Sequence, residues 1–247
     1  MKLWKAWFEV RQKFYLAFIL VTLLMLPAMV GTLVAASGSK EPAGGMTDEA
    51  GAAVPSAAEA FGRELDLWMA GEAHIIFAVL AVVLAVGGIL SLGNARSNLM
   101  TLSLPERRNR WLLAQAGVSA LLVLALCAWE AFILMATGWL AGFEVPEGRL
   151  LLAIVLTTLS AVIWVWPAIL GTALTRDAVR AALLVISVMV ALLLQTYVVR
   201  QPWFVFQGIA DLDAWEGGLP WRPLLAGAGL TALSAWRPLR KFERMEF

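Results

Sequence analysis

Long apolar runs alternate with charged connections along the whole chain, and this alternation limits the possible fold more than any other feature. The hydrocarbon core of a bilayer is about 30 Å thick, and a helix crosses it with about 20 apolar residues. Backbone amides in lipid must bond within their own segment, and the runs lack the polar and apolar alternation of a barrel strand, so each run predicts a transmembrane helix. The runs cover 14–36, 73–92, 111–139, 150–174, 178–199 and 219–236. The expected fold is all-α: a polytopic membrane protein with six transmembrane helices in a single domain, 1–247.

Composition and charge agree with this class and give the chain an orientation. The chain is 61% hydrophobic and 15% charged, with a mean hydropathy of +0.78, which exceeds what a soluble domain needs for its core. Short cytoplasmic connections are enriched in Lys and Arg. The connections that carry most of the basic residues alternate with connections that carry most of the acidic ones. We therefore expect a multi-pass protein of a bacterial cytoplasmic (inner) membrane, with both termini in the cytoplasm. The basic side holds Lys2, Lys5, Arg11, Lys13, Arg96, Arg107, Arg108, Arg110, Arg176, Arg180, Arg237, Arg240, Lys241 and Arg244.

Two segments outside the spans predict surface helices. Residues 1–14 mix Trp and Phe with Lys and Arg at near-helical spacing, which is typical of an interfacial helix that precedes a turn into the membrane. An ordinary basic flank of the first span is the alternative. The outer connection 37–72 begins with a flexible Gly, Ala, Pro and Ser stretch. Its second half, 55–71, predicts a short helix on the outer membrane surface, with a disordered loop as the alternative. Its apolar residues at helical spacing are Phe61, Leu65, Trp68 and Met69.

The cytoplasmic connection 93–110 combines apolar and basic residues in one compact amphipathic unit. Its apolar side chains can enter a groove while its arginines meet acidic groups of a partner protein or lipid phosphates. A basic loop that only sets the topology is the alternative reading. The residues that we expect to make the contact are Leu99, Met100, Leu102, Leu104, Pro105, Arg107 and Arg108.

The outer connection 200–221 is too apolar for water and too interrupted for a span. Non-helical backbone can enter a membrane where protein covers it, so this connection predicts a re-entrant or interfacial hairpin. An aromatic belt at the membrane surface is the alternative. Its aromatic residues include Trp203, Phe204, Phe206, Trp215 and Trp221.

Glu130 is the one clear acid deep within a predicted span. A lone carboxylate there is costly unless it is protonated, paired or exposed to water, so it is a functional candidate. A structural glutamate that is hydrogen-bonded between helices is an equal alternative. Polar residues on other spans that could pair with it are Thr157, Thr158, Ser160 and Gln195. We expect His74, at the outer mouth of the second span, to be a solvated interface residue rather than a ligand.

The connection 93–110 also carries a short pattern, Thr-Leu-x-Leu-Pro-x-x-Arg. The matching residues are Thr101, Leu102, Leu104, Pro105 and Arg108. The chain resembles the permeases of the type-2 ABC exporter family. The shared features are this pattern, the basic N-terminal helix, the six spans and the aromatic segment 201–221. The resemblance implies that 93–110 forms a coupling helix that seats on a separate ATP-binding subunit.

The resemblance also implies the partners and the energy source. The implied partners are two ABC ATP-binding subunits, a second permease copy or homologue, membrane lipid and extracytoplasmic accessory proteins. No nucleic acid is expected among them. The sequence has no Gly-Lys dipeptide and hence no phosphate-binding loop, so the chain is not an enzyme by itself. ATP and Mg are expected in the partner subunit, and no cofactor or metal in this chain, which has one histidine and one cysteine. The alternatives are a non-transporting membrane anchor or scaffold subunit, and an ion-coupled carrier that uses Glu130.

Overall fold

The computed structural model describes residues 2–38, 57–69, 73–87, 109–199 and 207–244. Every regular element within these ranges is a helix, which confirms the all-α class. The helices are α1 (Lys2–Gly38), α2 (Ala57–Met69), α3 (His74–Ala85), α5 (Asn109–Ala141), α6 (Glu147–Val162), α7 (Val165–Thr175), α8 (Ala178–Val199), α9 (Gln207–Ala210), α10 (Leu212–Glu216) and α11 (Trp221–Arg244).

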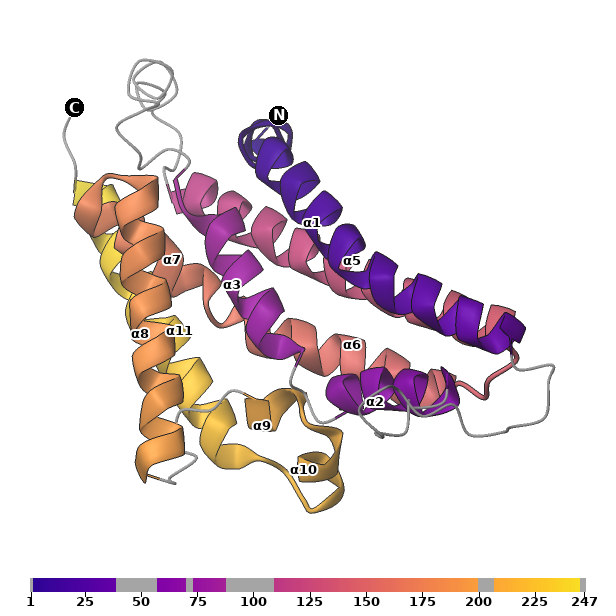
Figure 1. Cartoon of the computed structure of the whole chain (residues 1–247). Coiled ribbons are helices and arrows are strands. Elements are labelled where there is room, and N and C mark those ends of the chain that lie inside the picture. The colour runs from indigo at the N-terminus through magenta and orange to yellow at the C-terminus, as the bar shows by residue number, and fades with distance from the viewer. Residues whose placement is uncertain (1, 39–56, 70–72, 88–108, 200–206, 245–247) are drawn as a thin grey trace.

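The long helices run alternately between two ends of the bundle (Figure 1). The beginnings of α1, α5 and α8 lie at one end with the last turns of α3, α7 and α11. We call this the terminal end, because the first turn of α1 and the last turn of α11 are both there. The short helices α2, α9 and α10 lie at the opposite end. The chain therefore returns to the terminal end each time it completes a pair of passes.

Two stretches of the described chain are long and apolar enough to cross a membrane. They are α5, with 33 residues, and Glu147–Thr175, with 29 residues, which contains α6 and α7. His74–Ala85 and Ala178–Leu194 are shorter apolar helices. These findings agree with a membrane location, and the count of six spans stays a prediction.

The first helix differs from the expectation of a separate interfacial element. Residues 2–38 form one continuous helix of 37 residues, with no turn near Phe14. No glycine or proline lies between Lys2 and Phe14, so nothing in the local sequence ends the helix there. Helix α1 then packs lengthwise along α5 (Figure 1). The Phe18 and Trp129 rings lie 5.0 Å apart, and the Trp129 indole donates a hydrogen bond to Thr22 Oγ1 at 3.1 Å.

The second predicted span is shorter than expected. Helix α3 has 12 residues, which gives it a length of about 18 Å at 1.5 Å per residue. It ends at Ala85, because Val86 is extended and Gly87 has a φ of +89°, a left-handed conformation that favours glycine. The remainder of the predicted run, from residue 88, lies outside the described residues. The apolar run 73–92 is therefore not one uninterrupted helix.

The fourth predicted span is divided by a turn at Ile163 and Trp164. Pro167 follows four residues after Ile163 and has no N–H to donate to the Ile163 carbonyl. The Trp164 amide donates to the Ala161 carbonyl, three residues back rather than four, at 3.1 Å. Helix α7 begins at the next residue. This proline thus explains why a continuous apolar run forms two helices. Trp164 lies at the break and is almost fully buried.

The helix predicted within 55–71 forms as α2 and packs against the bundle at the opposite end. Among the described side chains of α2, Phe61, Leu65 and Trp68 are buried, as their helical spacing indicates. The Phe61 ring lies 5.4 Å from Phe143, and the Trp68 ring lies 5.6 Å from Phe77 of α3. The alternative of a disordered loop is therefore wrong for residues 57–69. A position on the membrane surface stays a prediction.

Candidate functional site

The residues predicted to couple the chain to a partner lie outside the described residues. They are Leu99, Met100, Leu102, Leu104, Pro105, Arg107 and Arg108. The structure does describe the two helices that enter and leave this segment. The last turn of α3 and the first turn of α5 both lie at the terminal end (Figure 1). The attachment points of the predicted coupling segment are therefore known.

Side chains from three other helices hold the end of α3. The Lys13 ammonium of α1 donates to the Val86 carbonyl, and Gln115 Nε2 of α5 donates to the Ala85 carbonyl at 2.9 Å. The Gly87 amide donates to Thr172 Oγ1 of α7 at 3.1 Å. We call Lys13, Gln115, Thr172 and the backbone of residues 85–87 the α3 junction. It satisfies backbone groups that the helix leaves without intrahelical partners.

Charge and conformation both favour the α3 junction. The carbonyl end of a helix carries a partial negative charge, and a lysine ammonium beside it is stabilising. The left-handed φ of Gly87 favours glycine, and a Cβ there would make ordinary van der Waals contact with the Ala178 Cβ at 3.5 Å and with Lys13 Nζ at 3.4 Å. The beginning of α8 therefore also touches this point. The chain enters residue 88 from a place where α1, α3, α5, α7 and α8 meet.

The two ends of the bundle differ in charge. Most basic residues with described side chains belong to the first part of α1, to the beginning of α5 or α8, to the residue after α7 or to the last part of α11, and these helix ends lie at the terminal end (Figure 1): Arg11, Lys13, Arg110, Arg176, Arg180, Arg237 and Arg240. Most acidic ones belong to the opposite end: Glu59, Asp66, Glu144, Glu147, Asp211, Asp213 and Glu216. Asp177 is an acid at the terminal end, and Arg63, Arg149 and Arg222 are bases at the opposite end. The fold thus gathers the basic connections of the sequence on one side.

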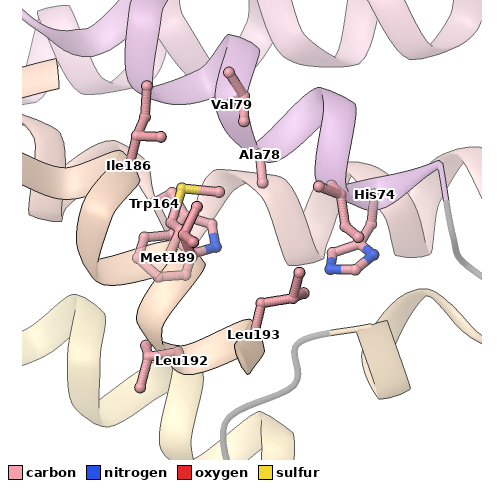
Figure 2. Close-up of a pocket in the computed structure, with 10 residues that line it drawn as sticks. His74, Ala78, Val79, Trp164, Ile186, Met189, Leu192 and Leu193 are labelled. Carbon is pink, nitrogen blue, oxygen red and sulfur yellow. The ribbon is translucent and has the colours of Figure 1, made fainter. Parts of the chain in front are cut away.

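An apolar pocket of about 70 Å³ lies between α3 and α8 (Figure 2). Its walls come from Ala78 and Val79 of α3, from Ile186 and Met189 of α8, and from Trp164 at the break between α6 and α7. His74, the first residue of α3, lies at one side of it. The expectation of a solvated His74 is wrong, since 5% of this residue is exposed. The pocket suits an apolar group rather than water, because a bound water needs several polar partners.

Glu130 is buried within α5, and the structure places several of its predicted partners on the adjacent α6. Thr157 and Ser160 are fully buried there, and the Ser160 hydroxyl donates to the Thr157 carbonyl at 3.0 Å. The Thr158 hydroxyl donates to Ile154 at 2.7 Å and lies within hydrogen-bonding reach of Cys127, one helical turn from Glu130. The side chain of Gln195 is not among those described. Glu130 is 3% exposed, and both its functional and its structural reading stay predictions.

The described part of the outer connection 200–221 forms two short helices, α9 and α10. Ile209, Ala210 and Leu212 are buried, and α9 packs against α6. The Trp215 indole donates to the Ile209 carbonyl at 2.9 Å, which ties the two helices together. Trp221 is half exposed and begins α11, while Trp203, Phe204 and Phe206 lie outside the described residues. A re-entrant position of this connection stays a prediction.

An exposed ion pair links α10 to the beginning of α6. Arg149 donates to Glu216 Oε1 at 2.7 Å, and Asp213 Oδ1 is 3.9 Å away. All three side chains are more than half exposed, so the pair contributes less than about 1 kcal/mol. Packing of the apolar residues of α9 and α10, rather than this ion pair, fixes their position.

Sequence reasoning missed the residues of the α3 junction. The sequence places Lys13 on the basic side and in the predicted interfacial helix 1–14, and its pattern does not single out Gln115 or Thr172. A signal was present, because Gln115 and Thr172 are polar residues inside predicted spans near the cytoplasmic side, and such residues usually find a partner. Gly87-Gly88 near the end of the second run is a second signal, because adjacent glycines are typical of a helix end.

Searches of protein-family models, of curated proteins and of solved structures found no match to this chain. The assignment of function therefore depends on the residues and their arrangement.

Proposed function

We propose that this chain is the transmembrane permease subunit of an ABC exporter and that separate cytosolic ATPase subunits drive it. The terminal end is its cytoplasmic side, so both termini lie in the cytoplasm. The protein is a multi-pass subunit of a bacterial inner membrane. The segment 93–110 is the coupling helix. ATP and Mg²⁺ bind to the partner, and this chain contributes no catalytic group.

One observation carries this proposal: the helices on either side of the segment 93–110 meet the basic residues of the chain at the terminal end. Lys and Arg are retained on the cytoplasmic side of membranes, where ATP is available. A segment that begins and ends on this side, and that carries apolar residues beside Arg107 and Arg108, suits docking to a cytosolic protein.

The transported molecule contains an apolar group, and it passes between two permease halves. The pocket between α3 and α8 supports this substrate class, because its walls are almost wholly apolar. Many apolar side chains of α8 are exposed in the single chain, including Val188 and Val190, and they suit contact with lipid, substrate or a second permease copy. Extracytoplasmic accessory proteins could bind at the opposite end.

Copurification tests this proposal. Wild-type chain captured from its native membrane is expected to bring down a protein that contains a G-x-x-x-x-G-K-[ST] loop. Combined Arg107→Glu and Arg108→Glu substitutions are expected to reduce that capture at least about tenfold, since like charges repel across a docking surface. Arg63→Glu with Arg222→Glu is the matched control at the opposite end and should leave capture unchanged.

Two results would contradict the proposal. One is a wild-type chain that brings down no ATPase; a stable assembly without one would instead favour the membrane scaffold. The other is equal loss of capture in the control pair, because the effect would then come from total charge rather than from the coupling segment. Correct insertion of each variant is checked by labelling of cysteines introduced at the terminal end.

A further inference from the structure

We propose that Lys13, Gln115 and Thr172 are positioning residues for the coupling segment. They fix the end of α3 to α1, α5 and α7, so that a displacement of the chain just beyond Gly87 moves these three helices together. This role rests on the proposed function, because it needs an ATPase that displaces the segment. It assigns to the α3 junction the transfer of that movement into the bundle.

The three attachments come from helices that are far apart in the sequence. Lys13 bonds Val86, which is 73 residues away, and Thr172 accepts from Gly87 across 85 residues. Gln115 Nε2 donates to the Ala85 carbonyl at 2.9 Å, and the Gly87 carbonyl oxygen lies 3.5 Å from the same nitrogen. Ser119 adds a longer bond to the Leu84 carbonyl at 3.4 Å. The last residues of α3 are thus tied to α1, α5 and α7 by side chains rather than by the backbone.

The burial of these groups makes the attachments stiff. Thr172 is fully buried and Gln115 is 4% exposed, so water cannot readily replace either partner. The Thr172 hydroxyl is used twice, because it also donates to the Ala168 carbonyl at 3.0 Å. Movement of Gly87 without α7 would therefore leave a buried amide without an acceptor. Because an unpaired buried amide costs free energy, α7 is expected to move together with Gly87.

The packing around α3 directs the movement into the bundle. Helix α3 contacts α1, α5, α7 and α8, and its last turn lies at the terminal end beside the first turn of α5 (Figure 1). Gly87 also lies near the beginning of α8, since a Cβ on it would be 3.5 Å from the Ala178 Cβ. A displacement that reaches Gly87 therefore acts on packed helices.

Thr137 offers a matched control for Thr172. Both are buried threonines whose hydroxyl donates to the carbonyl four residues earlier, at 2.8 Å for Thr137 and 3.0 Å for Thr172. Only Thr172 also accepts the Gly87 amide. The difference between Thr172→Val and Thr137→Val therefore isolates the attachment of α3 to α7. Thr172→Ser keeps the hydroxyl and should behave as the wild type. Lys13→Arg keeps the positive charge and should likewise behave as the wild type, unlike Lys13→Met.

Amide hydrogen exchange of the full assembly in lipid nanodiscs tests the role. Without nucleotide, Thr172→Val should speed exchange of the peptide around residues 84–87 by about 5-fold or more, and Thr137→Val should not. With a non-hydrolysable ATP analogue, the wild type and Thr137→Val should show a changed exchange rate at the terminal ends of α1, α5 and α7. Thr172→Val should lose this response in α7 alone, and Lys13→Met should lose it in α1 alone.

The outcomes separate this role from the function on which it rests. Equal exchange of residues 84–87 in Thr172→Val and Thr137→Val would overturn the attachment. A nucleotide response that persists in α7 of Thr172→Val would overturn the transfer of movement, even though an ATPase is bound. Absence of any ATPase from the wild-type assembly would instead overturn the proposed function, and this role with it.

Discussion

Replacement of Gly138 by alanine is expected to destabilise the protein by about 1–3 kcal/mol, because the site has no room for a methyl group. A Cβ at this position of α5 would lie 2.8 Å from Cζ of Phe61 and closer still to Cγ2 of Val145. Phe61 is a buried residue of α2, so its ring cannot turn away without loss of packing. The effect should appear as a lower thermal unfolding temperature in detergent.

Gly117 is the matched control for this prediction. It lies on the same helix, and a Cβ there would meet no atom within 4 Å. Alanine at 117 is therefore expected to leave stability unchanged or to raise it slightly, since glycine is a poor residue in a helix interior. Equal unfolding temperatures for the two variants would show that α2 does not pack over Gly138.

Trp68→Ala is expected to cost about 3–5 kcal/mol in the docking of α2. The Trp68 side chain is among the largest that are fully buried, and its ring lies 5.6 Å from Phe77. Its indole nitrogen is buried without a hydrogen-bond partner. Trp68→Phe should therefore cost much less, because it keeps the ring contact and removes an unpaired N–H group.

Limited proteolysis within α2 and thermal unfolding measure this effect. Trp139→Ala is the control, because the Trp139 side chain is 56% exposed and should contribute little to stability. If Trp68→Ala were cleaved no faster than Trp139→Ala, α2 would not be docked as described. If Trp68→Phe were as costly as Trp68→Ala, the indole nitrogen would have an essential partner.

Hydropathy and periodicity identified the long helices well. Helix α8 has the predicted bounds, 178–199, and α5 extends the predicted run 111–139 by two residues at each end. Helix α2 also followed from helical spacing alone. These features depend on local sequence, because an apolar run or an amphipathic repeat is visible without knowledge of its neighbours.

Features set by distant residues could not be predicted in the same way. The end of α3 depends on Lys13, Gln115 and Thr172, and hydropathy alone does not distinguish residue 87 from the apolar residues around it. The burial of His74 depends on its neighbours in the fold, and the pocket that it lines depends on α8 and on Trp164. The position of Glu130 within a helix was predictable from the apolar run around it, but its burial was not, because a carboxylate there can also be exposed to water.

The central claim is that the segment between α3 and α5 contacts a separate ATPase, and site-specific photo-crosslinking in intact cells tests it most directly. A photoreactive amino acid is placed at Met100 in the segment, with Asp66 on the exposed face of α2 as the control. The account predicts that position 100, and not position 66, crosslinks to a protein with a phosphate-binding loop. Crosslinks from position 100 to lipid alone, or to the same partner from both positions, would contradict it.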